Sequence, residues 1–286
     1  MRGLLITNKY MQSDKFSLLK ERFIDNARKL NIVMEYKNNF EAYELIEKDI
    51  QYDFILFYDK DIKLAKSLEK NGYKLFNNSD AILTCDDKFL TYMKLKNVVA
   101  QPKTIIAPFI YYDDLSDDNE FIIKCENNFT YPMILKECCG SFGMQVYKID
   151  NRVEFIDCVK KIAVKPFIVQ EFIKTSFGKD VRLQVVGDKV VAAMKRVNEN
   201  GDFRANVTNG AKAYEYEPND TEIEIALTTA KEIGVDFAGV DLLFGENGKS
   251  LLCEVNSNAH LEIIGKVSNK NIYKEILKYI QGRVKQ

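Results

Sequence analysis

The chain reads Gly239-Val240-Asp241-Leu242-Leu243-Phe244 and, after the turn Gly245-Glu246-Asn247-Gly248, continues as Ser250-Leu251-Leu252-Cys253-Glu254-Val255-Asn256. Two short apolar runs around a glycine-containing turn predict an antiparallel strand pair. Side chains alternate between faces along a strand, so Glu254 and Asn256 point the same way, and Asp241 can join them from the neighbouring strand. Carboxylate and amide oxygens suit Mg²⁺. The alternative is a solvated sheet face, but Asp and Glu are poor strand formers, which favours the metal site.

The composition is that of a globular protein: 286 residues, 46% hydrophobic and 29% charged, with a formal net charge of -1. This length predicts two or three subdomains. The balanced charge gives no support for a nucleic-acid or membrane-surface partner. No apolar stretch reaches the roughly 20 residues of a membrane span. Six scattered cysteines without a C-x-x-C pair fit reduced thiols, so we expect a cytoplasmic protein.

The first part of the chain alternates between strand-like and helix-like segments. The expected strands are 3–7, 32–36, 53–58 and 73–76, and the expected helices are 16–30 and 62–70. Such alternation predicts a small α/β unit with a parallel sheet. No Gly-x-Gly-x-x-Gly follows the first strand, so we assign no dinucleotide and expect this unit to form one wall of a substrate cleft.

The remainder of the chain mixes strands and helices without regular alternation. We expect strands at 104–107, 131–137, 144–147, 167–172, 180–186 and 190–196, and helices at 89–95, 153–162, 223–233 and 272–280. Asp86 or Asp87 can cap the first of these helices, and Gly234 is a suitable stop for the third. The acidic segment 113–120 is interpreted as a surface loop or a helix start.

Candidate phosphate ligands lie around Gly140-Ser141-Phe142-Gly143, a glycine-containing turn between two strands. An ordinary hairpin turn uses the same residues, and the Walker pattern is absent. Lys136 lies just upstream on an apolar strand, where a lone buried cation is costly, so a phosphate partner is a natural explanation. Lys88, on a helix, would by itself be assigned to the surface.

Arg182, Arg196 and Arg204 lie on or beside one predicted hairpin. Strand arginines usually face solvent, but three in one small sheet suggest forks for carboxylate or phosphate. His260, the single histidine, follows the acidic strand closely. A lone histidine is more often structural than catalytic, so it is assigned no acid–base role. It also leaves a cysteine nucleophile without an obvious base.

Taken together, these segments resemble the ATP-grasp superfamily, and most closely the RimK-type amino-acid ligases. The resemblance runs from about Ser79 to the C-terminus and rests on an ordered set of motifs: Lys88, Lys136, Gly140 to Val146, Gln170-Glu171-Phe172-Ile173, Gly178 to Arg182, Val190 to Arg196, Asp202 to Asn206, Gly239-Val240-Asp241 and Glu254-Val255-Asn256. It implies a Rossmann-like pre-ATP-grasp α/β domain at 1–83. Two α+β subdomains of the ATP-grasp fold follow, the central lid subdomain at 84–165 and the C-terminal subdomain with the metal site at 166–286.

The resemblance also implies roles for individual residues. Lys88 and Lys136 would hold the ATP phosphates, with Gly140, Ser141, Phe142 and Gly143 as the closing loop. Glu171, Phe172 and Ile173 would lie at the hinge that receives adenine, and Asp180 would bind the ribose. Arg204 would contact phosphate, and Asn206 would belong to the ATP-binding residues. Arg196 would face the acyl phosphate, which makes Arg196 and Arg204 the expected catalytic residues. Asp241, Glu254 and Asn256 would hold two Mg²⁺ ions, with Mn²⁺ as a substitute.

The implied activity is an ATP-dependent carboxylate–amine ligase. A carboxylate takes the γ-phosphate of ATP, and an amine, glutamate or another amino acid, then displaces phosphate to form an amide. The chain departs from the nearest family members at Asn209-Gly210, where they carry Gly-Gly. It departs again at Asn256-Ser257-Asn258-Ala259-His260, where they carry Asn-Ala-Ser-Pro-Gly. Arg182, Asn258 and His260 are therefore candidate substrate residues. The alternative is a nucleotide- or peptide-binding protein of this fold without ligase activity; a homo-oligomer is also left open.

Overall fold

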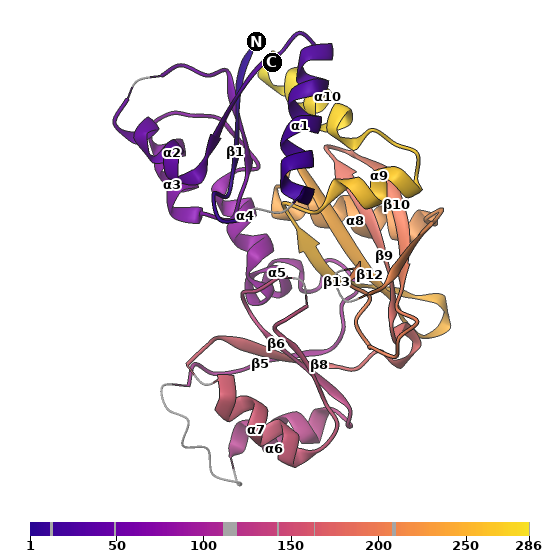
Figure 1. Cartoon of the computed structure of the whole chain (residues 1–286). Helices are drawn as coiled ribbons and strands as arrows, with labels where there is room; N and C mark the ends of the chain where they lie inside the picture. Colours follow the sequence, from indigo (N-terminus) through magenta and orange to yellow (C-terminus); the bar gives the residue numbers. More distant parts are fainter. Residues whose placement is uncertain are drawn as a thin grey trace.

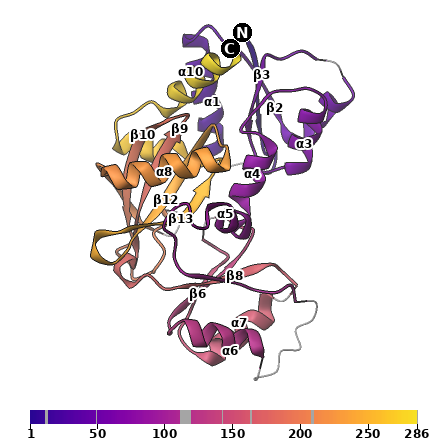
Figure 2. The same cartoon turned by 180° about the vertical axis from the view of Figure 1, so that it is seen from behind.

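The computed structural model describes residues 1–11, 14–48, 50–110, 119–141, 143–162, 164–207 and 210–285, and for residues 14–16 it describes the backbone. Phe142, Asn209 and most of the acidic segment 113–120 lie outside these ranges. Within them the chain forms an N-terminal, a central and a C-terminal sheet, each covered by helices (Figures 1 and 2). No helix among the described residues is long and apolar enough to cross a membrane.

The N-terminal sheet is parallel, with the strand order β2-β1-β3-β4. Its elements are β1 Arg2–Thr7, α1 Asp14–Lys29, β2 Val33–Asn38, α2 Asn39–Ala42, the 3-10 helix Tyr43–Ile46, β3 Phe54–Tyr58, α3 Ile62–Lys70 and β4 Leu75–Phe76. Strand β3 is apolar and buried throughout, as a central parallel strand requires. Asp61 caps α3 by accepting from the Leu64 amide. The parallel α/β unit expected from the sequence is therefore confirmed.

The central sheet is antiparallel, with the order β5-β8-β6-β7. Its elements are β5 Thr104–Ile106, α6 Glu120–Asn128, β6 Met133–Glu137, β7 Val146–Ile149, α7 Arg152–Ile162 and β8 Phe167–Glu171. Helices α6 and α7 cover one face of this sheet (Figure 1) and share a buried core with it. Strand β8 lies after the expected boundary at residue 166, yet it pairs with β5 and β6.

The C-terminal sheet has the order β11-β10-β9-β12-β13. Its elements are the 3-10 helix Lys174–Ser176, β9 Lys179–Val186, β10 Lys189–Val197, β11 Lys212–Glu215, α8 Asp220–Ile233, β12 Phe237–Phe244, the 3-10 helix Glu246–Gly248, β13 Ser250–Asn256, α9 Leu261–Val267 and α10 Ile272–Val284. The predicted hairpin of β9 with β10 and the antiparallel pair of β12 with β13 both form. Helix α8 covers one face (Figure 2); it begins in a capping box of Asn219 with Glu222 and ends at Gly234.

Helices α4 Ser79–Asp86 and α5 Lys88–Leu95 connect the N-terminal sheet to the rest of the molecule. Asp87 lies between them and accepts from the Phe89 and Leu90 amides, so it caps α5 as predicted. Ala81, Cys85 and Leu95 are buried in the same core as the C-terminal sheet and α8. This packing fixes Lys88, the first residue of α5, relative to the C-terminal sheet.

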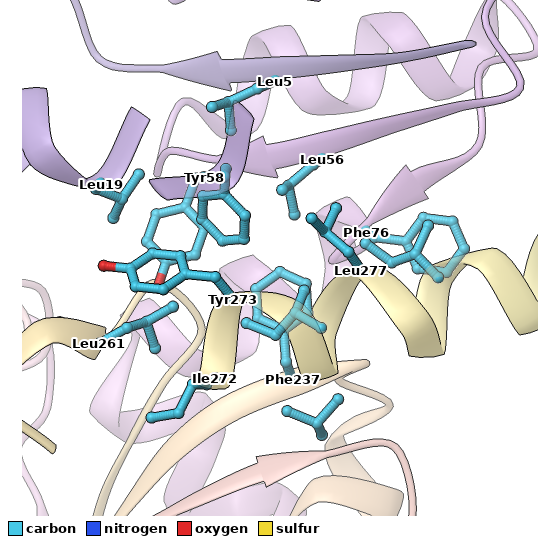
Figure 3. Packing of buried hydrophobic residues seen from close by; sticks show 14 of the residues in the cluster. Leu5, Leu19, Leu56, Tyr58, Phe76, Phe237, Leu261, Ile272, Tyr273 and Leu277 are labelled. Atoms are coloured by element: carbon cyan, nitrogen blue, oxygen red, sulfur yellow. The ribbon is translucent and has the colours of Figure 1, made fainter. Parts of the chain in front are cut away.

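The N-terminal and C-terminal parts share one hydrophobic core (Figure 3). In it, Tyr58 from β3 stacks on Phe237 from β12, and Phe23 from α1 meets Tyr273 from α10 edge to face. The Tyr58 hydroxyl donates to the Ala259 carbonyl at 2.5 Å, so the segment that follows β13 is tied to the end of β3. The N-terminal unit, which the sequence predicts to form one wall of a substrate cleft, therefore packs directly against the segment that follows β13.

Candidate active site

The two strands that carry the expected metal ligands pair as predicted. Asp241 on β12 lies opposite Glu254 on β13, and Asn256 lies opposite Gly239. A bulge between Asp241 and Leu242 leaves Cys253 as the extra residue on β13. The Asn256 amide nitrogen is 3.5 Å from Asp241 Oδ2, which shows that these side chains gather on one side of the pair.

A cavity of about 790 Å³, open to solvent, lies between the central and C-terminal sheets; we call it the nucleotide cavity. Its lining includes most of the residues singled out from the sequence: Lys88, Lys136, Gly143, Glu171, Phe172, Ile173, Asp180, Arg196, Arg204, Asn206, Asp241 and Glu254. It also includes Gln170 and Cys253, for which the sequence analysis predicts no role. The central and C-terminal sheets therefore bring the residues selected from the sequence motifs together around one cavity.

Lys136 is the most unusual residue of this cavity. Its side chain is on β6, only 7% of the residue is exposed, and no carboxylate lies within ion-pair distance of its ammonium among the described residues. The Lys136 ammonium contacts the Cys253 sulfur at 3.8 Å. Burial raises the pKa of the Cys253 thiol, which keeps it protonated and unable to neutralise the lysine. A buried cation without a counter-ion calls for an anionic ligand.

Lys88 faces the same space from the start of α5. Its ammonium is 3.9 Å from Glu254 Oε1 and 3.5 Å from the Cys138 carbonyl oxygen. The Lys88 side chain is 12% exposed, so the surface position that its helix alone suggested is wrong. Its packing against the C-terminal sheet, not visible in the sequence, accounts for the difference.

Each of the three arginines pairs with an aspartate of this chain. Arg182 donates from Nε and Nη2 to the two oxygens of Asp241, both at 2.6 Å. Arg196 binds Asp180 in the same forked manner, at 2.7 and 2.6 Å, and its Nη2 is also 2.9 Å from Asp241 Oδ2. Arg204 pairs with Asp202 in the loop before it. The fork geometry expected of these residues is present, with carboxylates of the protein as partners.

The pKa values of the two aspartates in this network shift in opposite directions. Burial raises the pKa of Asp180, and Arg196 offsets only part of that effect. Burial also raises the pKa of Asp241, but Arg182 and Arg196 together outweigh it, so the pKa of Asp241 lies below its usual range. Asp241 is therefore ionised and carries the negative charge that a metal ligand needs.

The glycine-containing turn lies next to these groups. Gly143 has φ +70°, and a Cβ there would be 2.7 Å from Asn206 Oδ1 and 3.3 Å from Arg204 Cδ. Arg204 Nη1 donates to the Gly143 carbonyl at 2.8 Å. Ser141 receives a hydrogen bond from Lys60 of the N-terminal unit at 3.1 Å, and Lys60 also pairs with Asp86. Ser141 and Gly143 therefore contact the N-terminal and C-terminal parts of the molecule, and Lys60 is a site residue that no sequence motif indicates.

Glu171 is the last residue of β8, at the hinge position expected from the sequence. Its Oε1 accepts from the Lys103 backbone amide at 2.7 Å, which connects β8 to the segment before β5. Phe172 and Ile173 follow and line the nucleotide cavity beside Pro102. An adenine in contact with these residues stays a prediction.

A second cavity of about 1180 Å³, also open to solvent, adjoins the first; we call it the acceptor cavity. Arg196, Asn206 and Glu254 line both cavities. The three residues proposed from the sequence for substrate contact, Arg182, Asn258 and His260, all line the acceptor cavity. Further walls come from the N-terminal unit with Lys60 and Leu19, and from α9 and α10 with Leu261 and Tyr273. Ser141, Met194 and Asn256 also belong to the lining, so Asn256 lines this cavity and not the nucleotide cavity.

The donor set is compatible with Mg²⁺. Glu254 and Asn256 supply oxygens, and Asp241 lies opposite Glu254. Among the described residues no group of three or more His, Cys, Asp and Glu side chains forms a metal cluster. A hard cation here would use Asn256 and oxygens of the nucleotide as well, which is how Mg²⁺ is commonly bound.

Comparison with known proteins decides the family. The family model of the RimK-like ATP-grasp domain matches residues 85–280. The chain belongs to the RimK-like ATP-grasp family. This RimK-like chain is 35% identical over 225 residues to a probable alpha-L-glutamate ligase of Legionella pneumophila, covering 78% of this chain and 72% of that protein. It is 30% identical over 202 residues to the N-acetylaspartylglutamate synthase A of Homo sapiens, covering 70% of this chain and 50% of that protein.

Solved structures share the fold of the RimK-like chain. The D-alanine–D-alanine ligase of Bacillus anthracis in complex with ATP has a TM-score of 0.76 at 17% identity, covering 99% of this chain and 96% of that one. A RimK domain ATP-grasp protein of Sphaerobacter thermophilus has a TM-score of 0.70 at 14% identity, covering 98% and 99%. The ATP-grasp fold and the ligase class inferred from the sequence are confirmed.

Proposed function

We propose that this RimK-like chain binds ATP in the nucleotide cavity and uses it to join a carboxylate to the amine of an amino acid. The observation that carries the proposal is the buried Lys136, whose ammonium faces the cavity without a carboxylate partner among the described residues. A polyphosphate would supply that partner. Lys88 and Arg204 line the same cavity and would share the phosphate charge.

The reaction divides between the two cavities. An oxygen of the substrate carboxylate attacks the γ-phosphorus of ATP, the bond to the bridging oxygen breaks, and ADP leaves. The amine nitrogen then attacks the acyl carbon, inorganic phosphate leaves, and the amine loses a proton. Arg196 lines both cavities and is buried, so it is suited to stabilise the negative charge at the acyl phosphate between them. No side chain acts as a covalent nucleophile.

Asp241, Glu254 and Asn256 would hold Mg²⁺ beside the phosphates. The ion, when bound, neutralises phosphate charge during transfer. The three residues would keep its position relative to Lys88, which lies 3.9 Å from Glu254. Cys253 and the apolar residues of the cavity would exclude water from the phosphates.

Glutamate is the amine that we favour. Relatives at 35% and 30% identity are named for alpha-L-glutamate ligation and N-acetylaspartylglutamate synthesis. Arg182 and Lys60 line the acceptor cavity; each is paired with an aspartate in this structure, and each would donate to a substrate carboxylate on release from it. The six cysteines are free thiols, which supports a cytoplasmic location.

ADP release from the full-length protein tests the proposal. The assay contains ATP and Mg²⁺, a panel of peptides and N-acetylated amino acids as carboxylates, and L-glutamate or one of the other amino acids as the amine. We expect ADP release that needs both partners, with an amide product detected by mass spectrometry. Nucleotide binding without amide formation in any combination would instead indicate a binding protein.

A further inference from the structure

The ion pair of Arg182 with Asp241 separates the two cavities. Asp241 lines the nucleotide cavity but not the acceptor cavity, whereas Arg182 lines the acceptor cavity but not the nucleotide cavity. Their side chains are only 11% and 4% exposed, and their contact is a full fork with both distances at 2.6 Å. Asp241 therefore faces the nucleotide cavity and Arg182 faces the acceptor cavity, and the ion pair connects the two residues.

The same carboxylate is also the expected metal ligand, and most of its acceptor capacity is occupied. Asp241 Oδ2 receives Arg182 Nη2 at 2.6 Å and Arg196 Nη2 at 2.9 Å, and Oδ1 receives Arg182 Nε at 2.6 Å. A divalent cation placed on this carboxylate would approach two guanidinium groups in a buried setting, where like charges are poorly screened. Metal and Arg182 therefore compete for Asp241.

We propose that Arg182 couples the two cavities: Asp241 holds its guanidinium until a divalent cation binds Asp241, and the released guanidinium then binds the carboxylate of the substrate in the acceptor cavity. The inference rests on the proposed function for the identity of that substrate. Arg196 stays in place during the exchange because Asp180 holds it through two further hydrogen bonds. Among the described residues Arg182 has no second carboxylate partner, so it is the partner that moves.

This exchange gives the reaction an order. Before the metal binds, Arg182 donates its Nε and Nη2 hydrogens to Asp241. A substrate carboxylate in the acceptor cavity therefore cannot bind these two donors. After the metal binds, the fork is free at the same time as the phosphates are neutralised. By thermodynamic reciprocity, a carboxylate bound to Arg182 would also strengthen metal binding at Asp241.

Metal binding without nucleotide gives the first test, with Mn²⁺ as the probe and its free concentration read by electron paramagnetic resonance. Arg182→Gln removes the competitor, so Mn²⁺ should bind about tenfold more tightly than in the wild type, within the range typical of coupled sites. Arg182→Lys, which keeps the charge but loses the fork, should fall between the two and serves if Arg182→Gln fails to fold. Arg2→Gln, which breaks a pair with Glu35 in the N-terminal sheet, is the matched control and should not change the affinity.

Release of the guanidinium is tested on the wild-type protein with phenylglyoxal, which modifies free arginines. Peptide mass spectrometry should show modification of Arg182 several-fold faster with Mn²⁺ than without it, and an unchanged rate at Arg2. Unchanged Mn²⁺ affinity in both Arg182 variants, or an unchanged rate at Arg182, would mean that Asp241 binds metal through the spare lone pair of Oδ1 and keeps its arginine. Either result overturns the coupling. Neither readout depends on ligation, so a failure of the proposed function would be seen separately, as absent ADP release.

Discussion

The Lys136 ammonium lies 3.8 Å from the Cys253 sulfur, across the gap between β6 of the central sheet and β13 of the C-terminal sheet. The lysine is buried, and the thiol beside it is neutral because burial raises its pKa. Folding therefore leaves a positive charge in a poorly solvated position between two sheets. Such an arrangement is costly for stability and becomes favourable when a phosphate binds.

Replacement of Lys136 should raise the stability of the protein and weaken its binding of ATP. Lys136→Met keeps the apolar stem and removes the charge, so the free energy of unfolding should rise by about 1 kcal/mol, as expected when a poorly compensated buried charge is removed. ATP should bind at least about tenfold more weakly, a loss of about 1.4 kcal/mol. Urea denaturation and calorimetric titration measure the two effects. Lys148→Met on β7, where the lysine pairs with Asp150, is the control and should leave ATP binding unchanged.

Removal of the carboxylate of Glu254 tests the metal site. Its side chain is 30% exposed and its nearest cation, Lys88, is 3.9 Å away, so Glu254→Ala should change the melting temperature little. Ligation should be abolished, because the oxygen that faces both cavities is gone. Glu246→Ala, in the exposed turn at the other end of the same strand pair, should retain full activity. A folded Glu254→Ala protein with wild-type turnover would remove this residue from the site.

Alanine substitution at Gly143 tests the glycine-containing turn, and alanine substitution at Gly201, outside the turn, is the matched control. Both have positive φ, at +70° and +83°, so alanine at either position costs about 1 kcal/mol in backbone strain. A Cβ at Gly143 would also displace Asn206 and Arg204, whereas nothing lies within 4 Å of a Cβ at Gly201. We expect Gly143→Ala to weaken ATP binding and turnover beyond the loss in Gly201→Ala. Equal effects of the two changes on turnover would show that the turn acts only through its backbone.

His260 is the N-cap residue of α9 and lines the acceptor cavity. A polar group that contacts substrate discriminates strongly against analogues that lack its partner. His260→Ala should therefore alter the ranking of amino acids in the ADP-release assay, with the KM for ATP nearly unchanged. Asn271→Ala, which removes the cap of α10, is the control for stability alone and should lower the melting temperature without a new ranking. An unchanged ranking in His260→Ala would leave His260 with a structural role only.

The sequence predicted the local elements of this fold better than its long-range contacts. The strand pair β12–β13 and α3 follow from apolar runs, glycine turns and caps that lie within a few residues of one another. Helix α4 was not predicted, because Ser79–Asp86 is buried on several sides by α3, β13 and α8 and has little amphipathic pattern. Strand β8 follows the predicted boundary at residue 166, which assigns it to the C-terminal subdomain, but its partners are β5 and β6.

The same distinction holds for the site. The residue types were identifiable from their motifs, and Lys136 from its apolar strand. The partners of the arginines were not identifiable, since Arg182 and Asp241 are 59 residues apart and meet only through the register of β9 with β12. Lys60 was missed for a related reason: it follows an ordinary buried strand, and only the packing of the N-terminal unit places it beside Ser141.

The central claim is that the γ-phosphate of ATP passes to a substrate carboxylate before the amide forms. The most direct measurement uses the carboxylate substrate selected by the ADP-release panel, labelled with ¹⁸O in that carboxylate, with the wild-type protein, ATP, Mg²⁺ and the amine. The proposed reaction predicts one ¹⁸O atom in each inorganic phosphate released, in equal amounts with ADP and amide. Inorganic phosphate free of ¹⁸O would contradict it, because the phosphoryl group would then have passed to water.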